Sequence, residues 1–168
     1  MPRPSGRGEE IMLNIWLQPH KDGGDMPFVR VWIHLIWSTK NREKIISKEL
    51  KPKLLEHIKN NSKLKSIWLD SINCVQDHIH LMISIGAEQN ISKIVMLLKG
   101  ESSHRINKYQ LTQVKFEWQE EYITLSVSES AVNSVREYIL NQEGHHKIKS
   151  FKEEYDEFLE NYGVNSVN

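Results

Sequence analysis

The sequence predicts an α+β domain built on an antiparallel sheet. Three observations predict this class: four short segments rich in β-branched and aromatic residues, two segments of helical period between them, and a tight junction between the middle two strands. The predicted order is β-α-β-β-α-β, followed by two more helices. This is the order of the ferredoxin-like split β-α-β fold, with helices on one face of the sheet and an added C-terminal helix pair.

The first strand and the first helix rest on clear patterns. "FVRVWIHLIWS", residues 28–38, is rich in Val, Ile and aromatic residues and predicts a strand. A basic loop follows. "SKELKPKLLEHIKNNSKLK", residues 47–65, predicts a helix because Leu50, Leu54 and Ile58 recur at a spacing of four.

Two consecutive strands and a second helix come next. Residues 66–75 and 78–85 predict strands that are joined by a tight turn. Residues 90–109 predict a helix that begins at Asn90 or Ser92, because both residue types cap helix N-termini. The middle of the chain therefore supplies the hairpin and the second helix of the fold.

The remaining elements are one strand and two helices. Residues 122–128 alternate in polarity and predict the last strand. Residues 129–142 predict a helix capped by Ser128. Ser150 and Glu153 form a capping box that predicts the start of the final helix.

Composition bounds the class of protein. Residues 1–25 hold several Pro and Gly without a period, so we expect an extension outside the fold, and residues 26–168 as a single domain. The extension does not have the pattern of a signal peptide, and no apolar run reaches the roughly 18 residues that a membrane helix needs. The single cysteine, Cys74, excludes an internal disulfide, so we expect a protein of the reducing cytoplasm.

The net charge of zero hides an uneven distribution. Residues 26–115 hold 15 Lys and Arg against 7 Asp and Glu, whereas residues 116–168 hold 4 against 11. A basic domain with an acidic tail suits a protein that binds a polyanion on one surface. Scattered solvated lysines with an acidic surface helix would give the same counts.

The segment "QDHIHLMISI" places two histidines in a predicted strand. His78 and His80 project to the same face because alternate residues of a strand share a face, whereas Ile79 and Leu81 project to the opposite, helix-packed face. Imidazole is a good ligand for divalent metals, but a third ligand is needed. On the residues alone, a metal site and two polar residues on a solvated face both remain open.

A third ligand could come from the segment "REYILNQEGHH". Tyr138 and Gln142 stand four residues apart on a predicted helix and therefore share a face. Val132, Val135 and Ile139 form a neighbouring apolar stripe that we expect to pack on the sheet, which places Tyr138 at the stripe's edge. A boundary tyrosine and an ordinary surface glutamine would fit the same pattern.

Together these stretches resemble one protein family. A His-hydrophobic-His strand, followed by a helical tyrosine with glutamine four residues on, is similar to the single-tyrosine HUH transposases, the IS200 group of insertion-sequence transposases and their REP-associated relatives. The resemblance runs from Val31 to Val164. It is carried by "IHLIWSTKNR", "DHIHLMISI", "LKGESS", "FEWQEEYITLSVSES", "YILNQEGHH" and "SFKEEYDEFLENYGV". Two departures are the extension before Met26 and Glu121, where we expect glycine.

The resemblance implies a mechanism and a set of partners. It implies that Tyr138 cleaves single-stranded DNA, forms a 5′-phosphotyrosine and releases a 3′-OH. His78, His80 and Gln142 would hold Mg²⁺ or Mn²⁺. The expected substrate is single-stranded DNA with a hairpin near the ends of the element. The expected assembly is a homodimer, in which the tyrosine helix can complete the partner subunit's site.

Basic and aromatic residues are candidates for binding this DNA. Lys40, Arg42 and Lys44 lie in the basic loop after the first strand and could contact phosphates or a hairpin. Trp118 and Tyr122 are candidates for stacking on bases. Solvated charges and core or rim aromatics are the alternatives.

The other histidines carry weaker expectations. His34 and His104 are expected to be structural or surface residues. His145 and His146 follow Gln142 by about one helical turn, and we expect a loop or DNA-facing position rather than a ligand role.

Three further functions remain open on the residues. They are a non-catalytic or domesticated single-stranded DNA hairpin-binding protein, an RNA-binding module on the same fold, and a relaxase or replication-initiator nickase. The presence of both Tyr138 and the predicted ligands favours catalysis. RNA-binding modules of this fold carry aromatic residues on the central strands, where this chain has histidines with Ile and Met.

Overall fold

A computed structural model of the protein describes residues 29–145 and Glu153. Residues 31–168 form one compact unit by their internal contacts, and the helices and strands described here belong to this unit. The extension predicted over residues 1–25 lies outside the described residues. The single domain predicted over residues 26–168 is therefore described in its larger part, and its exact boundary stays a prediction.

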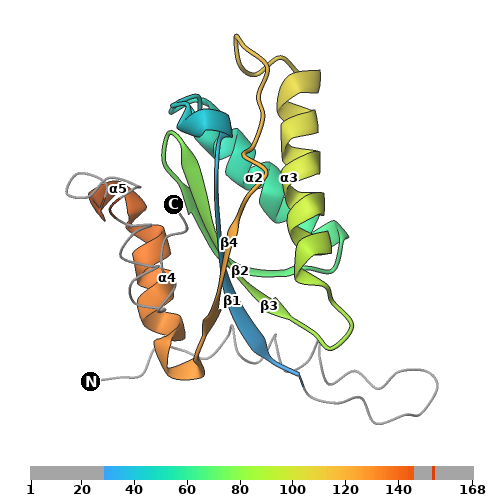
Figure 1. The fold of residues 1–168 in the computed structure, drawn as a ribbon, viewed down its shortest axis with the longest axis vertical. Coiled ribbons are helices and arrows are strands. Elements are labelled where there is room, and N and C mark those ends of the chain that lie inside the picture. Colours follow the sequence, from blue (N-terminus) through green and yellow to red (C-terminus); the bar gives the residue numbers. More distant parts are fainter. Residues whose placement is uncertain (1–28, 146–152, 154–168) are drawn as a thin grey trace, which may run out of the picture. The chain divides into compact units, whose positions relative to one another are not determined.

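The described elements follow the predicted order (Figure 1). The strands are β1 (Val31–Ser38), β2 (Trp68–Cys74), β3 (His78–Ile85) and β4 (Ile123–Val127). The helices are α2 (Leu50–Leu64), α3 (Ile91–Lys108), α4 (Val132–Leu140) and α5 (Gln142–His145). Two short 3-10 turns are η1 (Lys40–Arg42) and η2 (Glu129–Ala131).

The strands form an antiparallel sheet in the order β2-β3-β1-β4. β1 pairs with β3 along its whole length and with β4 on its other side, while β2 pairs with the outer edge of β3. α2 connects β1 to β2, and α3 connects β3 to β4. This topology confirms the predicted ferredoxin-like fold.

One face of the sheet forms the main hydrophobic core. Leu54 and Ile58 of α2 and Ile94 and Leu98 of α3 pack against it, in agreement with the spacing that predicted the first helix. The alternate residues of β1 and β3 that fill this face are Ile33, Leu35, Trp37, Ile79, Leu81 and Ile83. Burial of these side chains is the main source of stability, because apolar burial contributes about 25 cal/mol per Å².

The opposite face of the sheet carries the histidines and is covered by α4. In Figure 1, α4 lies on the side of the sheet away from α2 and α3, and it packs against β2 and β3. Val132 and Ile139 of α4 are buried, and Val135 is half-buried, as the apolar stripe predicted. The two helices of the β-α-β-β-α-β unit thus cover one face, and the added helix α4 covers part of the other.

The helix ends agree only in part with the sequence. Asn90 caps α3 as predicted, because its Oδ1 accepts the backbone N–H of Lys93 at 3.0 Å. Ser128 stands at the N-cap position of η2, where the predicted helix begins, but its side chain makes no capping bond and pairs with the hydroxyl of Ser130 instead. The N-cap of α4 itself is Ala131. The predicted capping box before the final helix lies outside the described residues, apart from Glu153, which is helical.

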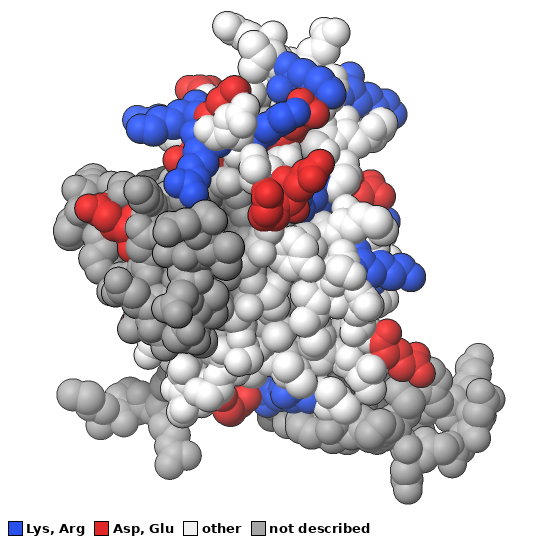
Figure 2. Space-filling view, in the orientation of Figure 1, with Lys and Arg blue, Asp and Glu red and all other residues white. Residues whose placement is uncertain are grey.

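Basic side chains gather at one end of the described surface. Figure 2 shows Lys and Arg at the end where η1 and the last turn of α3 lie in Figure 1, with acidic side chains among them. η1 supplies Lys40 and Arg42, and the last turn of α3 supplies Arg105 and Lys108. Within residues 29–145, the structure contains no helix that is long and apolar enough to cross a membrane.

Candidate active site

The two histidines of β3 lie side by side and are buried. The ring centroids of His78 and His80 are 5.1 Å apart, and both side chains are 0 % exposed. In the sheet, His78 pairs with Ser38 of β1, and His80 pairs with Ile36 of β1 and Asn73 of β2. The pairing of β3 with β1 and β2 therefore holds both histidine side chains on the same face of the sheet, as expected.

Tyr138 extends from α4 toward this histidine face. Its ring stands edge-on to His80, with centroids 5.8 Å apart, and edge-on to His34, with centroids 6.2 Å apart. The side chain is half-buried, in agreement with its predicted place at the edge of the apolar stripe. A tyrosine that is far from the histidines in sequence thus lies beside them in the fold.

Gln142 is fully buried, at 0 % exposed. The predicted single helix over residues 129–142 is divided, because α4 ends at Leu140 and Gln142 begins the short helix α5, which packs against β2. Asn141 makes the junction, and its N–H still bonds the carbonyl of Glu137 at 3.0 Å. Burial excludes the alternative of an ordinary surface glutamine.

Polar bonds attach α4 to the edge strand β2. The Arg136 guanidinium donates two hydrogen bonds to the Asp70 carboxylate, from Nε at 2.9 Å and from a terminal nitrogen at 2.8 Å, and this pairing raises the pKa of Arg136. Nδ2 of Asn73, the register partner of His80, donates to the carbonyl of Leu140 at 2.9 Å. These bonds fix both ends of the segment that carries Tyr138.

Two further residues contact the histidine pair. Asp77, directly before β3, places Oδ1 2.7 Å from Nδ1 of His78. Nε2 of His34 lies 3.0 Å from Nδ1 of His80. His34 is 3 % exposed, and burial lowers its pKa to about 4.

The structure gives His34 a different place from the expected structural or surface position. Its side chain is buried, and it contacts His80 inside the candidate site. The alternation of His34 with Ile33 and Leu35 is the signal that could have placed it on the face away from the core. His104, by contrast, is exposed on α3, as expected.

The donor set of this face fits a divalent metal. Imidazole nitrogens suit first-row divalent ions, and an amide oxygen suits Mg²⁺ and Mn²⁺. Among residues 29–145 and Glu153, no group of three or more His, Cys, Asp and Glu side chains is placed to hold a metal ion. The amide of Gln142, which is buried in α5, is a donor of another type that could complete a set with His78 and His80.

Comparison with known proteins identifies the family. A family model described as "Transposase IS200 like" matches residues 28–142. The chain belongs to this family. The ISDra2 transposase TnpA of Deinococcus radiodurans is 28% identical over 114 residues, which cover 65% of this chain and 81% of the relative.

Solved structures confirm the fold of this IS200-like transposase. A crystal structure described as a transposase from Deinococcus radiodurans R1 has a TM-score of 0.58 and 25% identity, covering 71% of this chain and 95% of that chain. A REP-associated tyrosine transposase bound to a REP hairpin has a TM-score of 0.55 and 11% identity, and covers 73% of both chains. The predicted family resemblance and the predicted fold are both confirmed.

The basic residues predicted to bind DNA lie on the surface of the transposase. Lys40, Arg42 and Lys44 are all exposed, and Lys40 forms an ion pair with Glu117 at 3.2 Å. Arg42 has a φ of 57°, which is a strained conformation for a side chain of this size and is typical of functional turns. Their DNA contacts stay a prediction.

The two aromatic candidates differ in exposure. Trp118 is 8 % exposed, and its ring packs edge-on against Phe116 and Trp37, so it is a core residue in this structure. This is the alternative that the sequence left open, and it does not favour Trp118 as a stacking surface. Tyr122 is 38 % exposed, which leaves it suitable for stacking.

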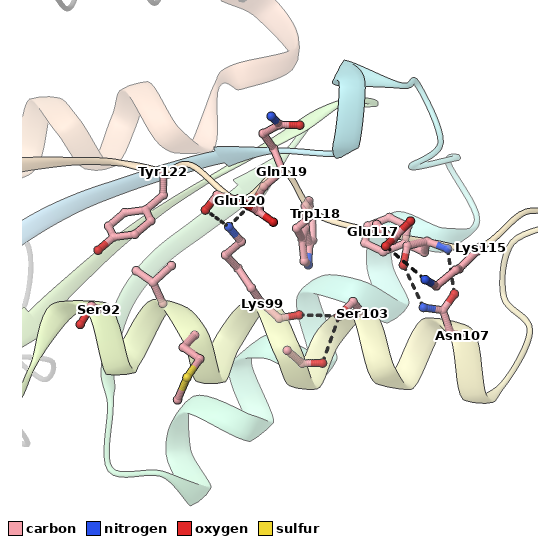
Figure 3. Close-up of a pocket in the computed structure, with 14 residues that line it drawn as sticks. Ser92, Lys99, Ser103, Asn107, Lys115, Glu117, Trp118, Gln119, Glu120 and Tyr122 are labelled. Carbon is pink, nitrogen blue, oxygen red and sulfur yellow. Dashed lines mark hydrogen bonds and ion pairs between the residues drawn. The ribbon is translucent and has the colours of Figure 1, made fainter.

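Tyr122 and Trp118 both line a cavity of about 550 Å³ between α3 and the segment before β4 (Figure 3). Lys99 crosses this cavity and donates to the carbonyls of Gln119 and Glu120, and burial lowers its pKa. None of the candidate site residues of β3 and α4 lines the cavity. It is therefore separate from the histidine face.

A second cavity, of about 500 Å³, borders the histidine face. We call it the β1–β4 hollow; it is lined by Ile36, Trp37, Ser38, Asn41, Arg42, Gln119, Glu121, Tyr122 and Ile123. Ile36 and Ser38 are the register partners of His80 and His78, so the hollow lies along the strand next to β3, although no candidate site residue of β3 or α4 lines it. The basic turn forms part of its wall.

Two histidines, His145 and His146, follow Gln142 in the sequence. His145 ends α5 and His146 lies outside the described residues. Their predicted loop or DNA-facing position stays a prediction.

Proposed function

We propose that this transposase nicks and rejoins single-stranded DNA at the ends of an insertion sequence, through a 5′-phosphotyrosine at Tyr138 and with a divalent metal. The single observation that carries the proposal is the position of the Tyr138 ring, whose centroid lies 5.8 Å from that of the buried His80, the strand neighbour of His78. A nucleophile beside a metal-binding pair is what phosphoryl transfer to a side chain requires.

Tyr138 would act as the nucleophile. Its hydroxyl would lose a proton to solvent, and the phenolate oxygen would form a bond to the scissile phosphorus as the bond from that phosphorus to the 3′ oxygen breaks. The leaving oxygen would take a proton from solvent and become a free 3′-OH, while the 5′ phosphate stays on the tyrosine. The reverse attack by a 3′-OH rejoins the strand, so no nucleotide cofactor is needed to drive the step.

His78, His80 and Gln142 would hold Mg²⁺ or Mn²⁺. The bound ion would neutralise charge on the phosphate oxygens and lower the energy of the leaving oxygen. Two neutral imidazoles and a neutral amide leave the ion's positive charge undiminished for that purpose. Their complete burial also keeps bulk water away from the ligand side of the site.

The basic turn η1 is the proposed contact for DNA phosphates. It follows Ser38, the register partner of His78, and the N–H of Thr39 bonds the carbonyl of Asp77 at 2.8 Å. Lys40 and Arg42 are therefore tied to the turn that precedes the histidine strand. Phosphate contacts from such residues would set the position of the strand without reading its sequence.

The proposed substrate carries a DNA hairpin near the element ends. The solved REP-associated tyrosine transposase is bound to a REP hairpin, which supports a hairpin partner for this chain. The β1–β4 hollow would accept unpaired bases, with Tyr122 as a stacking residue. A non-catalytic hairpin-binding protein would share these contacts and would differ in forming no covalent adduct.

Adduct formation tests the proposal. The protein is incubated with single-stranded DNA from the element's own ends and Mn²⁺, and a covalent protein–DNA band is sought on a denaturing gel. We expect the band with wild type and with the matched control Tyr109→Phe, an exposed tyrosine at the C-terminal end of α3, and its loss in Tyr138→Phe or with EDTA. A band that persists in Tyr138→Phe would exclude Tyr138 as the nucleophile.

A homodimer is part of the same proposal, with each active site completed either within one chain or by the partner subunit's tyrosine helix. The family resemblance implies that the helix can complete the partner subunit's site, whereas α4 here lies on its own sheet. Mixing His80→Ala with Tyr138→Phe distinguishes the two. Sites completed between subunits would recover adduct in the mixture, and sites completed within one chain would not.

A further inference from the structure

Each of the two metal-site histidines has its Nδ1 atom held by a neighbouring side chain. Nδ1 of His78 lies 2.7 Å from Oδ1 of Asp77, and Nδ1 of His80 lies 3.0 Å from Nε2 of His34. Both distances are those of good hydrogen bonds. With Nδ1 engaged in this way in both rings, a metal would have to bind at Nε2.

The identity of the neighbours fixes where the protons must lie. A carboxylate only accepts hydrogen bonds, so the bond to Asp77 requires a proton on Nδ1 of His78. A neutral imidazole carries one N–H, and its other nitrogen keeps the lone pair that binds a metal. For His80 to ligate through Nε2, its Nδ1–H must donate to Nε2 of His34, whose own proton then lies on Nδ1.

We propose that Asp77 and His34 are positioning residues that hold the Nδ1–H tautomers of His78 and His80, so that both rings present Nε2 to the divalent cation. This inference rests on the proposed function, because it takes these two histidines as the metal ligands. Outer partners of metal-bound histidines are usually carboxylates, backbone carbonyls or water. Asp77 belongs to this usual set, whereas a histidine is a less common partner.

The surroundings of Asp77 support a fixed position. Its backbone carbonyl accepts two hydrogen bonds from Thr39, from the N–H at 2.8 Å and from the hydroxyl at 3.1 Å. The N–H of Val75 bonds the carbonyl of His78 at 3.0 Å and closes the turn before β3. Hydrogen bonds from Thr39 and Val75 therefore hold the backbone around Asp77, and this restricts the position of its carboxylate.

The surroundings of His34 link the ligand to the nucleophile. His34 lies on the central strand β1, diagonal to His80 across the β1–β3 pairing, and its ring reaches the neighbouring strand. The same ring stands edge-on to Tyr138, with centroids 6.2 Å apart. One buried side chain thus contacts both His80 and Tyr138, and a rigid strand positions it.

The tautomers can be measured in the wild-type protein without metal. Long-range ¹H–¹⁵N correlation spectra of ¹⁵N-histidine-labelled protein distinguish protonated from unprotonated ring nitrogens. We expect both His78 and His80 to carry the proton on Nδ1. If His80 instead carries it on Nε2, with His34 donating to its Nδ1, the inference for His34 is overturned; the same result at His78 overturns the inference for Asp77.

Mn²⁺ titration by calorimetry, without DNA, provides the second test. Loss of an outer partner costs about 10–100-fold in metal affinity, so we expect that range for His34→Leu and Asp77→Ala. His34→Gln and Asp77→Asn keep an acceptor of similar reach and should restore most of the affinity. His104→Gln, on the surface of α3, is the control and should bind as wild type does.

The outcomes separate this inference from the proposed function. If folded His34→Leu binds Mn²⁺ with wild-type affinity, the positioning role of His34 is wrong, even where the Tyr138 adduct forms. If the tautomers and the affinity losses are as expected but no adduct forms, the metal site stands and the nucleophile assignment fails. If wild type binds no Mn²⁺, both the metal site and this inference are wrong.

Discussion

The two faces of the sheet are buried in different ways. On one face, alternate apolar residues of β1 and β3 pack against two long helices, α2 and α3. On the other face, His34, His78 and His80 lie beneath the nine-residue helix α4, and Tyr138 stays half-buried. The same strands thus present only apolar side chains to α2 and α3 on one side, and three imidazoles among apolar side chains on the other.

We expect the two faces to contribute differently to the stability of the fold and to its chemistry. Apolar burial is non-directional and favourable over the whole core, so the α2–α3 face supplies most of the folding free energy. Buried polar groups cost free energy unless they are paired, so the histidine face stabilises the fold less and depends on particular bonds. We expect substitutions on the first face to lower stability, and substitutions on the second to remove activity.

The largest expected effect comes from His80→Ala on the polar face. Losing a ligand should lower the rate of adduct formation by more than about 100-fold, since even outer partners cost 10–100-fold. Rates of adduct formation in Mn²⁺ measure this, with the exposed His104→Ala as control. A variant that unfolds, rather than a folded inactive one, would break the separation between the two faces.

The neighbouring residue Leu81 makes the matched test on the apolar face. Its side chain is 0 % exposed, and Leu81→Ala should lower the free energy of unfolding by about 2–5 kcal/mol. Chemical denaturation measures the change. The folded fraction should keep its Mn²⁺ affinity, and a selective loss of metal binding would show that the two faces are not independent.

Arg136→Met is expected to release α4 locally. The Arg136–Asp70 pair is partly exposed, so its loss should cost only about 1 kcal/mol. Amide hydrogen exchange should become faster in α4 while α3 keeps its protection. Equal acceleration in both helices would show that α4 opens only with the whole fold.

Asn90→Ala should give the smallest effect, and amide exchange should become faster in α3 rather than in α4. Loss of the α3 cap should lower the free energy of unfolding by about 1 kcal/mol or less, because α3 packs on the main hydrophobic core. Thermal unfolding measures the change, with Lys93→Ala, an exposed side chain of the same helical turn, as the control. Faster exchange confined to α4 in this variant would contradict the division between the two helices.

Much of this arrangement follows from the sequence, and the reasons are local. The period of Leu50, Leu54 and Ile58 and the alternation in β3 specify which side chains share a face. The order of the elements then specifies the topology. The relation of His78 and His80 to Tyr138 was suggested by the family resemblance and not by spacing.

The remainder depends on contacts between distant segments. His34 reaches His80 only because β1 and β3 pair in one register, and no local pattern reveals that register. The break of the predicted helix before Gln142 likewise accompanies a long-range bond from Asn73 to the carbonyl of Leu140. Local patterns predicted neither His34 as a member of the site nor this break.

We propose above that the polar face of the sheet is a metal site, and anomalous diffraction from crystals grown with Mn²⁺ tests this. We expect a single strong peak within coordination distance of Nε2 of both His78 and His80, with the amide oxygen of Gln142 as a further ligand. A bound Mn²⁺ at any other position, with these three side chains unliganded, would contradict it.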